Sequence, residues 1–584
     1  MPCNELMLPC LNVSGIIQTM FIRIKSKPTQ TNAFSKAIQI VESSRVQGKV
    51  KQRLLKHIGM AYDETQLADL KAIAQIHKEK LEEIAQFSLF NADDLPVIEP
   101  KAPESVKPSD AFENDEDFNV DLRELKEQGR IVNGIHDIYG ELFDQLNLPS
   151  IFKNPLRNKS SVNIFKQIVM ARIANPDSKR ASVKGLEEQF GVTINLDQVY
   201  RMMDKIDDKT IENLNELAYR TTKKLFNDKI DVIFFDATTL YFESFTEDEF
   251  KKNGYSKDLK FNQPQVVLAL MVTQEGLPIG YQAFSGDTFD GHTLMPALEQ
   301  LKSQYNLGKV VYVADSGMFN EANLSQLEER DFDYIVGARI KNLPNSLKEK
   351  ILDSRQYQAL NTSIKVARFE HKNRTLVVTY SEKRAKKDRF EREKGIAKLK
   401  LKVEKHQSPK DYLSNQGYKK FLQLDKQCDA KIILNEEKIN EASQWDGLKG
   451  LIVSKSCGLS DEEILTQYNN LWQVEQSFRI TKHDLKIRPI YHWKPSRVKA
   501  HLAISFAAYM LSRYLEHRVK TQYKKLSPAV LRSLLLSVQT SVLDHPQKKI
   551  KYGLPSSIKP DSMKIYQLMG VKMKRSAYIQ QFSL

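Results

Sequence analysis

Cysteine is scarce in this chain, with only four residues in 584. They lie too far apart for a C-x-x-C metal knuckle, and their spacing gives no disulfide framework. The four are Cys3, Cys10, Cys428 and Cys457. This scarcity excludes a small disulfide-stapled secreted domain and fits a thiol-reducing compartment.

Long apolar runs are also missing. The most apolar run, residues 265–272, has the length of a strand, whereas a membrane-spanning helix needs about 18 or more apolar residues. Residues 1–19 have no basic stretch before their apolar part, which argues against a secretory signal. We therefore expect a soluble cytoplasmic protein with no membrane partner. We also expect residues 1–19 to be an upstream extension, with the working protein starting near Met20.

Positive charge is what the chain has in excess. Its 88 Lys and Arg against 73 Asp and Glu give a net charge of +15 and a pI near 9.2. With 41% hydrophobic and 28% charged residues the chain can bury ordinary cores, which excludes wholesale disorder. A positive surface favours an acidic partner, nucleic acid first, because phosphate contacts release condensed counterions.

The N-terminal region, residues 20–92, has the pattern of a small basic α+β arm. Residues 21–25 and 37–41 predict strands, and a helix is expected over residues 64–85. Residues 45–56 hold five basic residues and no acidic one. A DNA-contacting arm and a merely solvated unit explain this pattern equally well.

A change of composition follows. Residues 93–120 are rich in proline and acidic residues and predict a linker, whereas residues 121–226 predict a mainly helical DNA-binding domain. Within it, helices are expected over Lys179–Phe190 and Leu196–Ile206, with a turn at Gly191 between them. Their outline resembles a helix-turn-helix, an outline that many helical bundles share.

The order of elements over residues 227–339 predicts the first part of an α/β catalytic core of the RNase H-like class. Apolar runs at 230–235, 265–272 and 277–284 indicate hairpin-linked strands. Helices then alternate with strands expected at 310–314 and 334–338.

This core is then interrupted. Residues 340–445 predict an inserted β-rich and basic domain, in which the charged stretch 383–405 fits either a solvated helix or a phosphate-tracking surface. Residues 446–520 predict the second part of the core, with a long helix that starts after the capping-box sequence Ser460–Glu463. Residues 521–584 predict a C-terminal helical region.

Two aspartates stand where core strands are expected to end. Asp236 follows the strand at 230–235, and Asp315 follows the strand at 310–314. Phosphodiester chemistry with two divalent ions about 4 Å apart needs acidic ligands from separate elements. A lone aspartate after a strand is usually a turn residue, but two in this strand order favour a metal site.

Glu475 is the candidate third acid, on the predicted long helix. At about 100° per residue, five residues of this helix fall within an arc of about 80°. They are Tyr468, Leu471, Glu475, Arg479 and Lys482. A carboxylate flanked by tyrosine and basic residues predicts a metal ligand beside a phosphate track, with a solvated ladder of ion pairs as the alternative.

These residues carry a resemblance to a known family. The segment from Tyr468 through Glu475 to Lys482 resembles the Y-x2-R-x3-E-x6-K signature of insertion-sequence DDE transposases of the IS-four-type superfamily. Other similar segments are 20–25, 48–53, 236–243, 256–258, 315–320, 485–491 and 500–502, so the resemblance covers roughly residues 20–520. One departure is Leu471, which stands where the signature has arginine.

The resemblance implies a DNA transposase that binds the ends of an insertion sequence, cleaves a strand and transfers it. Asp236, Asp315 and Glu475 would be the catalytic residues and the ligands of two Mg²⁺ ions, with Mn²⁺ as a substitute. DNA-binding residues are expected at Tyr468, Arg479, Lys482 and Arg488. The implied partners are double-stranded DNA, as terminal inverted repeats and target, and a second copy of the chain in a synaptic complex. The implied location is the prokaryotic cytoplasm, at the nucleoid when bound to DNA.

Supporting residues can be named as well. Tyr241 and Glu243 follow Asp236 closely and are expected to brace it. His292, His483 and His501 are expected to be structural or to face phosphates, because this chemistry requires no histidine dyad. Two other functions stay open: an RNase H-like nuclease that cuts without joining, and a transposase-derived DNA-binding protein that has lost catalysis.

Overall fold

The computed structural model divides into two units, residues 1–118 and 119–584. The described residues are 18–26, 36–46, 49–61, six helical positions between 64 and 78, 118–226, 230–243, 246–254, 263–288, 292–293, 295–299, 310–316, 321–405, 417–424 and 432–579. Nearly all of the predicted extension (1–19) and linker (93–120) lies outside these residues. In the described residues no helix is both long and apolar enough to cross a membrane.

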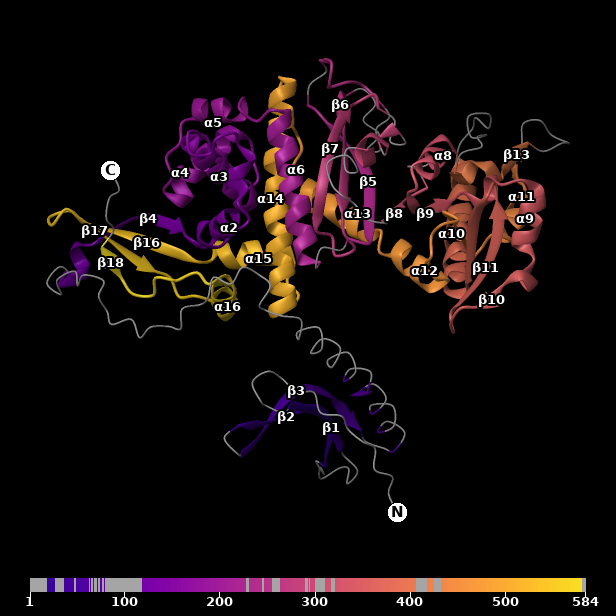
Figure 1. Cartoon of the computed structure of the whole chain (residues 1–584), viewed down its shortest axis with the longest axis horizontal. Helices are drawn as coiled ribbons and strands as arrows, with labels where there is room; N and C mark the ends of the chain where they lie inside the picture. Colours follow the sequence, from indigo (N-terminus) through magenta and orange to yellow (C-terminus); the bar gives the residue numbers. More distant parts are fainter. Residues whose placement is uncertain are drawn as a thin grey trace. The chain divides into compact units, whose positions relative to one another are not determined.

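The first unit contains a three-stranded antiparallel sheet in the order β1-β2-β3 (Figure 1). Its strands are β1 (Gln18–Ser26), β2 (Lys36–Val46) and β3 (Lys49–Ala61). The strands predicted at 21–25 and 37–41 are confirmed, and the basic residues 45–56 belong to β2 and β3, which was not predicted. The described positions of the predicted helix are helical, and its Ala74 packs on Ile38.

The second unit is built on a nine-stranded sheet in the order β10-β11-β12-β15-β9-β8-β5-β6-β7 (Figure 1). Its first five strands in the chain are β5 (Val232–Tyr241), β6 (Gln265–Val272), β7 (Pro278–Ser285), β8 (Val311–Ala314) and β9 (Asp333–Ala338). β5, β6 and β7 are antiparallel neighbours, whereas β8 runs parallel to β5 and to β9. Helix α8 (Glu321–Glu329) makes the crossover from β8 to β9. This order is the RNase H-like one, as predicted.

Strand β5 is longer than predicted. The threonines and the tyrosine after Asp236 favour strand, and the pairing with β6 continues as far as Tyr241 opposite Gln265. Asp236 therefore lies in the middle of β5, and the prediction that it ends a strand is wrong. Asp315 does follow directly on the end of β8, as expected.

The inserted region continues the core sheet. Its strands β10 (Gln358–Ala359), β11 (Ile364–His371) and β12 (Arg374–Ser381) connect through β15 (Leu448–Val453), which pairs antiparallel with both β12 and β9. The region also contains α9 (Asn345–Leu352), α11 (Glu436–Ser443) and the pair β13 (Leu422–Leu424) and β14 (Ile432–Leu434). The insertion therefore widens the catalytic sheet and shares its hydrogen-bond ladder.

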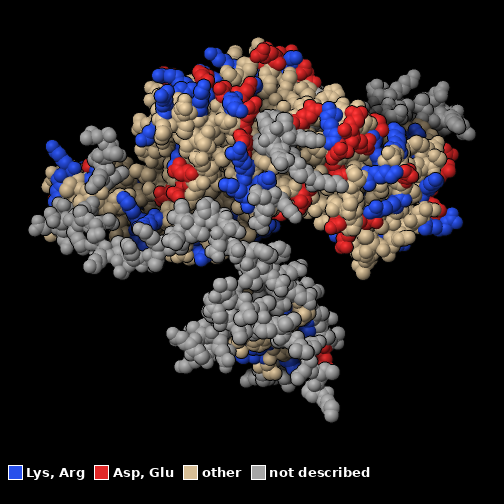
Figure 2. Space-filling view, in the orientation of Figure 1, with Lys and Arg blue, Asp and Glu red and all other residues tan. Residues whose placement is uncertain are grey.

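The charged stretch 383–405 lies in helix α10 (Glu382–Lys405). Neighbouring turns of α10 pair at the i, i+4 spacing, for example Lys386 with Glu382 at 3.1 Å. Figure 2 shows acidic side chains interspersed among the basic ones over the right-hand part of the second unit, where α10 lies. These features favour the solvated helix of the two alternatives.

A long buried helix, α14 (Pro495–Gln522), connects the helical region to the sheet. In Figure 1 it stands beside α6, between the group α2–α5 and the strands β5–β7. The helices are α2 (Gly134–Gln145), α3 (Lys159–Ala174), α4 (Lys179–Phe190), α5 (Leu196–Met203) and α6 (Asp208–Leu225). The two predicted helices of the helix-turn-helix outline are present, and Gly191 ends α4 in the left-handed conformation (φ 65°) that favours glycine. All pack into one core with the sheet.

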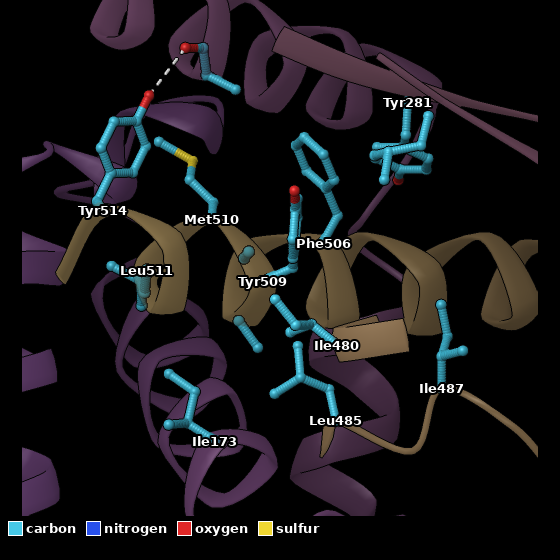
Figure 3. Packing of buried hydrophobic residues seen from close by; sticks show 14 of the residues in the cluster. Ile173, Tyr281, Ile480, Leu485, Ile487, Phe506, Tyr509, Met510, Leu511 and Tyr514 are labelled. Atoms are coloured by element: carbon cyan, nitrogen blue, oxygen red, sulfur yellow. Dashed lines mark hydrogen bonds between the residues drawn. The ribbon is translucent and has the colours of Figure 1, made fainter. Parts of the chain in front are cut away.

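Close packing surrounds α14 on both sides. Figure 3 shows Phe506 reaching toward Tyr281 of β7, with a distance of 4.6 Å between ring centroids, and Leu485 on the other side of the helix. The turn between β6 and β7 also contacts α14, because Arg513 Nε donates to Gly276 O at 2.8 Å. A Cβ at position 276 would overlap this guanidinium, and the residue has φ +73°, so glycine is required there.

The C-terminal region corrects a prediction. Residues 521–584 contain α15 (Pro528–Leu536) and α16 (Pro560–Met569), but also the strands β16 (Gln539–His545), β17 (Ile550–Pro555) and β18 (Tyr578–Ile579). These strands form a sheet in the order β18-β17-β16-β4, whose last member, β4 (Lys126–Val132), comes from the predicted helical domain. A strand whose partner is some 400 residues away in sequence has little local signal. The expectation of a purely helical C-terminus is therefore wrong.

Candidate active site

The sheet brings the two aspartates to the same level. In the parallel pair β5 and β8, Phe234 lies opposite Val313. Asp236 stands two residues further along β5, and Asp315 stands two residues beyond Val313, directly after the end of β8. Because alternate residues of a strand share a face, both aspartates lie on the face of Phe234 and Val313. Asp236 is half-buried and Asp315 is exposed.

The glutamate comes from a helix on that face. Val474 and Phe478 of α13 (Trp472–Arg479) belong to the same core as Phe234, and α13 packs against β5 and β6 (Figure 1). Glu475 is exposed on this helix. The fold therefore collects all three predicted carboxylates on one side of the sheet.

The predicted long helix is interrupted between Tyr468 and Glu475. It starts as expected, with a capping box in which Ser460 and Glu463 each accept a hydrogen bond from the other's backbone N–H, but this first helix, α12 (Asp461–Asn469), ends before Glu475. Leu471 N donates to Tyr468 O in a tighter turn before α13 begins, and a π-helical segment, η9 (Ile480–Asp484), follows α13. The predicted stripe of five residues on one exposed face is wrong, because Tyr468 and Leu471 are buried while Glu475 and Arg479 are exposed.

Tyr468 links the helix to the strands. Its hydroxyl donates to Asp315 Oδ1 at 3.3 Å. Burial, followed by the charge of Asp315 and its hydrogen bond, raises the pKa of Tyr468, and the charge of Glu475 acts in the same direction. The phenol therefore stays protonated and remains a donor to the carboxylate.

Two basic residues beside Tyr468 were not predicted. Lys449 of β15 lies over the Tyr468 ring, with Nζ 4.2 Å from the ring centroid. Burial lowers the pKa of Lys449, the charge of Arg384 from α10 lowers it further, and Asp315 opposes the shift. A lysine inside an apolar strand was the available signal for Lys449, whereas nothing in the charged stretch distinguishes Arg384.

Gly337 of β9 makes room for the tyrosine. A Cβ at this position would stand 2.5 Å from Tyr468 Oη and 3.1 Å from Ser316 N. Contacts this close require backbone or side-chain shifts, so even alanine would push the hydroxyl away from Asp315. The sequence gives no sign of this requirement, because the clash involves segments more than 100 residues apart.

We expect Tyr468→Phe to lower the rate of DNA cleavage by about tenfold. The substitution removes the donor that orients Asp315 and keeps the ring, and loss of such a supporting hydrogen bond typically costs about 10–100-fold at metal sites. The measurement is the single-turnover cleavage rate of a DNA duplex carrying the element end.

Tyr357→Phe is the matched control, since the Tyr357 hydroxyl donates to the carbonyl oxygen of Ile351 in the inserted region, at 2.7 Å. The control should cleave at the wild-type rate. An unchanged rate in Tyr468→Phe would show that the hydrogen bond to Asp315 has no part in the reaction.

The other predicted DNA-binding residues are arranged in two groups. Arg479 is exposed one helical turn beyond Glu475, and Lys482 follows in η9 as a half-buried residue. Arg488 lies elsewhere, with its guanidinium 4.9 Å from the centroid of the Tyr241 ring. Tyr241, predicted to brace Asp236, is thus in contact with a basic residue at the far end of β5.

Leu471 is explained by packing. It is 8% exposed and belongs to the core that contains Val474 and Phe478. An arginine here would have to bury its charge or displace the turn between α12 and α13. The departure from the signature is therefore accommodated as a core residue in this chain.

The donor set suits hard divalent cations. Asp236, Asp315 and Glu475 offer only carboxylate oxygens, the ligands that Mg²⁺ and Mn²⁺ prefer. Within the described residues, no three Asp, Glu, His or Cys side chains are already close enough together to form a metal site. The fit consequently rests on the shared face and register of the carboxylates and on the chemistry of their oxygens.

The order of the strands and the side of the sheet that carries the three carboxylates define the class of the protein. It has an RNase H-like enzyme core that acts on nucleic acid. Two family models match the chain: "Transposase DDE domain" over residues 227–511 and "IS1634 family transposase, N-terminal domain" over residues 22–88. The chain belongs to the insertion-sequence DDE transposases. It is accordingly a DNA transposase, an enzyme that cleaves DNA and transfers the cut strand, and its family uses divalent metal ions.

Solved structures give weaker likenesses. A piggyBac transposase synaptic complex with hairpin DNA aligns at 12% identity with a TM-score of 0.35, covering 69% of this chain and 76% of that one. A Mos1 transposase paired-end complex with left transposon end aligns at 13% identity with a TM-score of 0.14, covering 27% of this chain and 53% of that one. Scores this low do not establish a common fold over the aligned lengths. No curated protein matches the chain.

Proposed function

We propose that this transposase cuts and joins the ends of its own insertion sequence, with Asp236, Asp315 and Glu475 holding two Mg²⁺ ions. The observation that carries the proposal is that Asp236 and Asp315 each stand two residues beyond the paired Phe234 and Val313 of β5 and β8, on the side of the sheet where α13 carries Glu475. Mn²⁺ would substitute, because its oxygen preference is similar. Bound ions of this kind supply Lewis-acid activation of the attacking oxygen and of the phosphodiester.

The chain's own residues have distinct tasks in this proposal. Tyr468 holds the Asp315 carboxylate through its hydroxyl, and Lys449 and Arg384 place positive charge next to it. Arg479, exposed on the same helix as Glu475, and Lys482 would contact DNA phosphates beside the carboxylates. The positive groups thus surround an acidic centre, which lets a polyanion approach it.

The remaining parts of the proposal concern partners and location. The basic N-terminal arm and the helical region 121–226 would bind the terminal inverted repeats, and the core would bind target DNA. Two copies of the chain would hold two ends in a synaptic complex. The cell compartment would be the prokaryotic cytoplasm, with the protein at the nucleoid.

The test is a strand-transfer assay with the full-length protein. Linear DNA that carries the sequences flanking the coding region is incubated with a target plasmid and Mg²⁺, and the products are resolved by size and sequenced across the junction. We expect cleavage at the element ends and joined plasmids. Cleavage without joining would identify a nuclease, and binding without cleavage would identify an inactive DNA-binding protein.

A further inference from the structure

A basic cavity lies between the helical region and the end of the core. It has a volume of about 380 Å³ and is lined by the start of α4, the segment after η9 and the start of α14. Five Lys or Arg residues line it against one acidic residue, Asp177. The five are Arg172, Lys179, Arg180, Lys486 and Arg488. The end of α3, the start of α4 and the segment after η9 therefore contribute positive charge to one cavity.

Two of these cations are buried. Arg172 and Lys179 are each 3% exposed. Arg172 donates to the carbonyl oxygens of Leu485 and Lys486 at 3.3 and 3.1 Å, and Lys179 Nζ lies 3.4 Å from His501 Nδ1. Within the described part of the chain neither forms an ion pair with a carboxylate. Burial lowers the pKa of both groups, and for Lys179, where Arg172 acts in the same direction, it lies well below its usual value. The charge of Asp177 opposes the shift of Arg172. An anion in the cavity would stabilise the charged form of the buried lysine.

The two histidines that line the cavity, His492 and His501, are neutral and carry no charge into it. His501 Nε2 donates to Ile487 O at 2.9 Å, which leaves Nδ1 as an acceptor for Lys179 and fixes a neutral imidazole. Burial keeps the pKa of His501 well below its usual value and lowers that of His492 to about 3, with Lys179 acting in the same direction on both. His501, predicted to be structural or to face phosphate, is a buried residue that bonds Ile487 O and lies against Lys179.

The N-terminus of helix α4 also lines the cavity. Ser178 caps α4 by accepting from Ala181 N, and Lys179 and Arg180 are the first two helical residues. The positive end of the helix dipole and the first backbone N–H groups of α4 therefore face the same space as the buried cations. Phosphate, a compact oxyanion that accepts several charge-assisted hydrogen bonds, matches such a site.

The position of the cavity connects it to the candidate active site. Arg488 lines the cavity and stacks on Tyr241, five residues beyond Asp236 on β5. Five residues of extended strand span roughly 17 Å, which equals about five nucleotide steps along a B-DNA strand. One DNA duplex can therefore reach both places.

We propose that this cavity binds one backbone phosphate of the transposase's DNA, with Lys179 and Arg172 as its buried cations. The inference rests on the proposed function for the identity of the DNA, but it concerns binding and not catalysis. Lys179 is a phosphate-positioning residue in this view, one that holds the duplex a few nucleotides from the reacting bond.

The test compares full-length wild type with Lys179→Met, which keeps the side-chain length and removes the charge. Lys184→Met is the matched control: Lys184 is exposed on the same helix and pairs with Glu188 at 3.5 Å. DNA binding is measured by fluorescence anisotropy over a series of salt concentrations, with a duplex from the flanking DNA and one of unrelated sequence. Thermal unfolding is measured in inorganic phosphate and in chloride at equal ionic strength.

We expect Lys179→Met to flatten the plot of log affinity against log salt by about 0.9, the value for one phosphate contact, on both duplexes. Phosphate should raise the Tm of the wild type and of Lys184→Met but not that of Lys179→Met. If phosphate raised the Tm but the salt slopes were unchanged, the cavity would bind a free anion, and the proposal that it binds a DNA phosphate would be wrong. Equal slopes and no phosphate effect would overturn the proposal entirely. Both readouts are independent of cleavage, so they separate this inference from the strand-transfer test.

Discussion

Replacement of Asp236 or Asp315 by alanine is expected to abolish cleavage of element-end DNA, with a loss of roughly 10³-fold or more, the scale found when a group essential to transition-state stabilisation is removed. One carboxylate comes from β5 and the other from the residue directly after its neighbour β8, so removing either leaves half of these oxygen donors. The measurement is single-turnover cleavage in Mg²⁺, beside a gel-shift measurement of binding to the same duplex. Binding should be almost unchanged, because the basic residues of the arm, of the helical region and of the cavity remain.

The matched control is Asp231→Ala. Asp231 is an exposed aspartate immediately before β5, on the same segment as Asp236 but away from the other carboxylates. This variant should cleave at the wild-type rate, whereas Glu475→Gln should lose cleavage like the aspartate variants. The two variants are assayed separately. Full cleavage by Asp236→Ala, with no cleavage by Asp315→Ala, would contradict the assignment of the two aspartates as a pair.

The parts of this fold that could be predicted are those with strong local patterns. The apolar runs of β5, β6, β8 and β9 are buried strands, and their order along the chain is enough to identify the RNase H-like sheet. The start of the glutamate helix was equally readable, since Ser460 and Glu463 form the capping box that their spacing indicates. The position of Asp315 directly after a strand was also predictable, because the apolar run 310–314 is short and ends at this aspartate.

The parts that could not be predicted depend on contacts between distant segments. A continuous 100° rotation per residue is a fair assumption for residues 468–482, but the turn at Leu471 and the π-helical η9 break it. Tyr468 is consequently buried against Asp315, and only Gly337, on another strand, permits that approach. Lys179 is the clearest case: the sequence shows it as an ordinary basic residue at a helix start. Its burial beside Arg172 and His501 exists only after the two ends of the second unit have packed together.

Leu511→Ala is expected to destabilise the second unit by about 2–5 kcal/mol, the usual cost of truncating a fully buried leucine. Leu511 is 0% exposed in α14 and belongs to the core shared by the helical region and the sheet (Figure 3). The measurement is urea unfolding followed by tryptophan fluorescence, which reports this unit because Trp445, Trp472 and Trp493 all lie within residues 119–584. Leu156→Ala removes the same atoms at a position that is 92% exposed, and should change stability by less than about 0.5 kcal/mol.

Comparison of Leu511→Ala with Asp236→Ala separates the loss of folding from the loss of catalysis. α14 packs against η9, which continues the helix of Glu475, and its first turns line the cavity of Lys179. Leu511→Ala should therefore cleave DNA at the wild-type rate while it is folded and lose cleavage and DNA binding together at a lower temperature than the wild type. Asp236→Ala should keep the wild-type melting temperature and DNA binding, without cleavage at any temperature. Loss of cleavage by Leu511→Ala while it is still folded and bound to DNA would contradict a purely supporting role of α14.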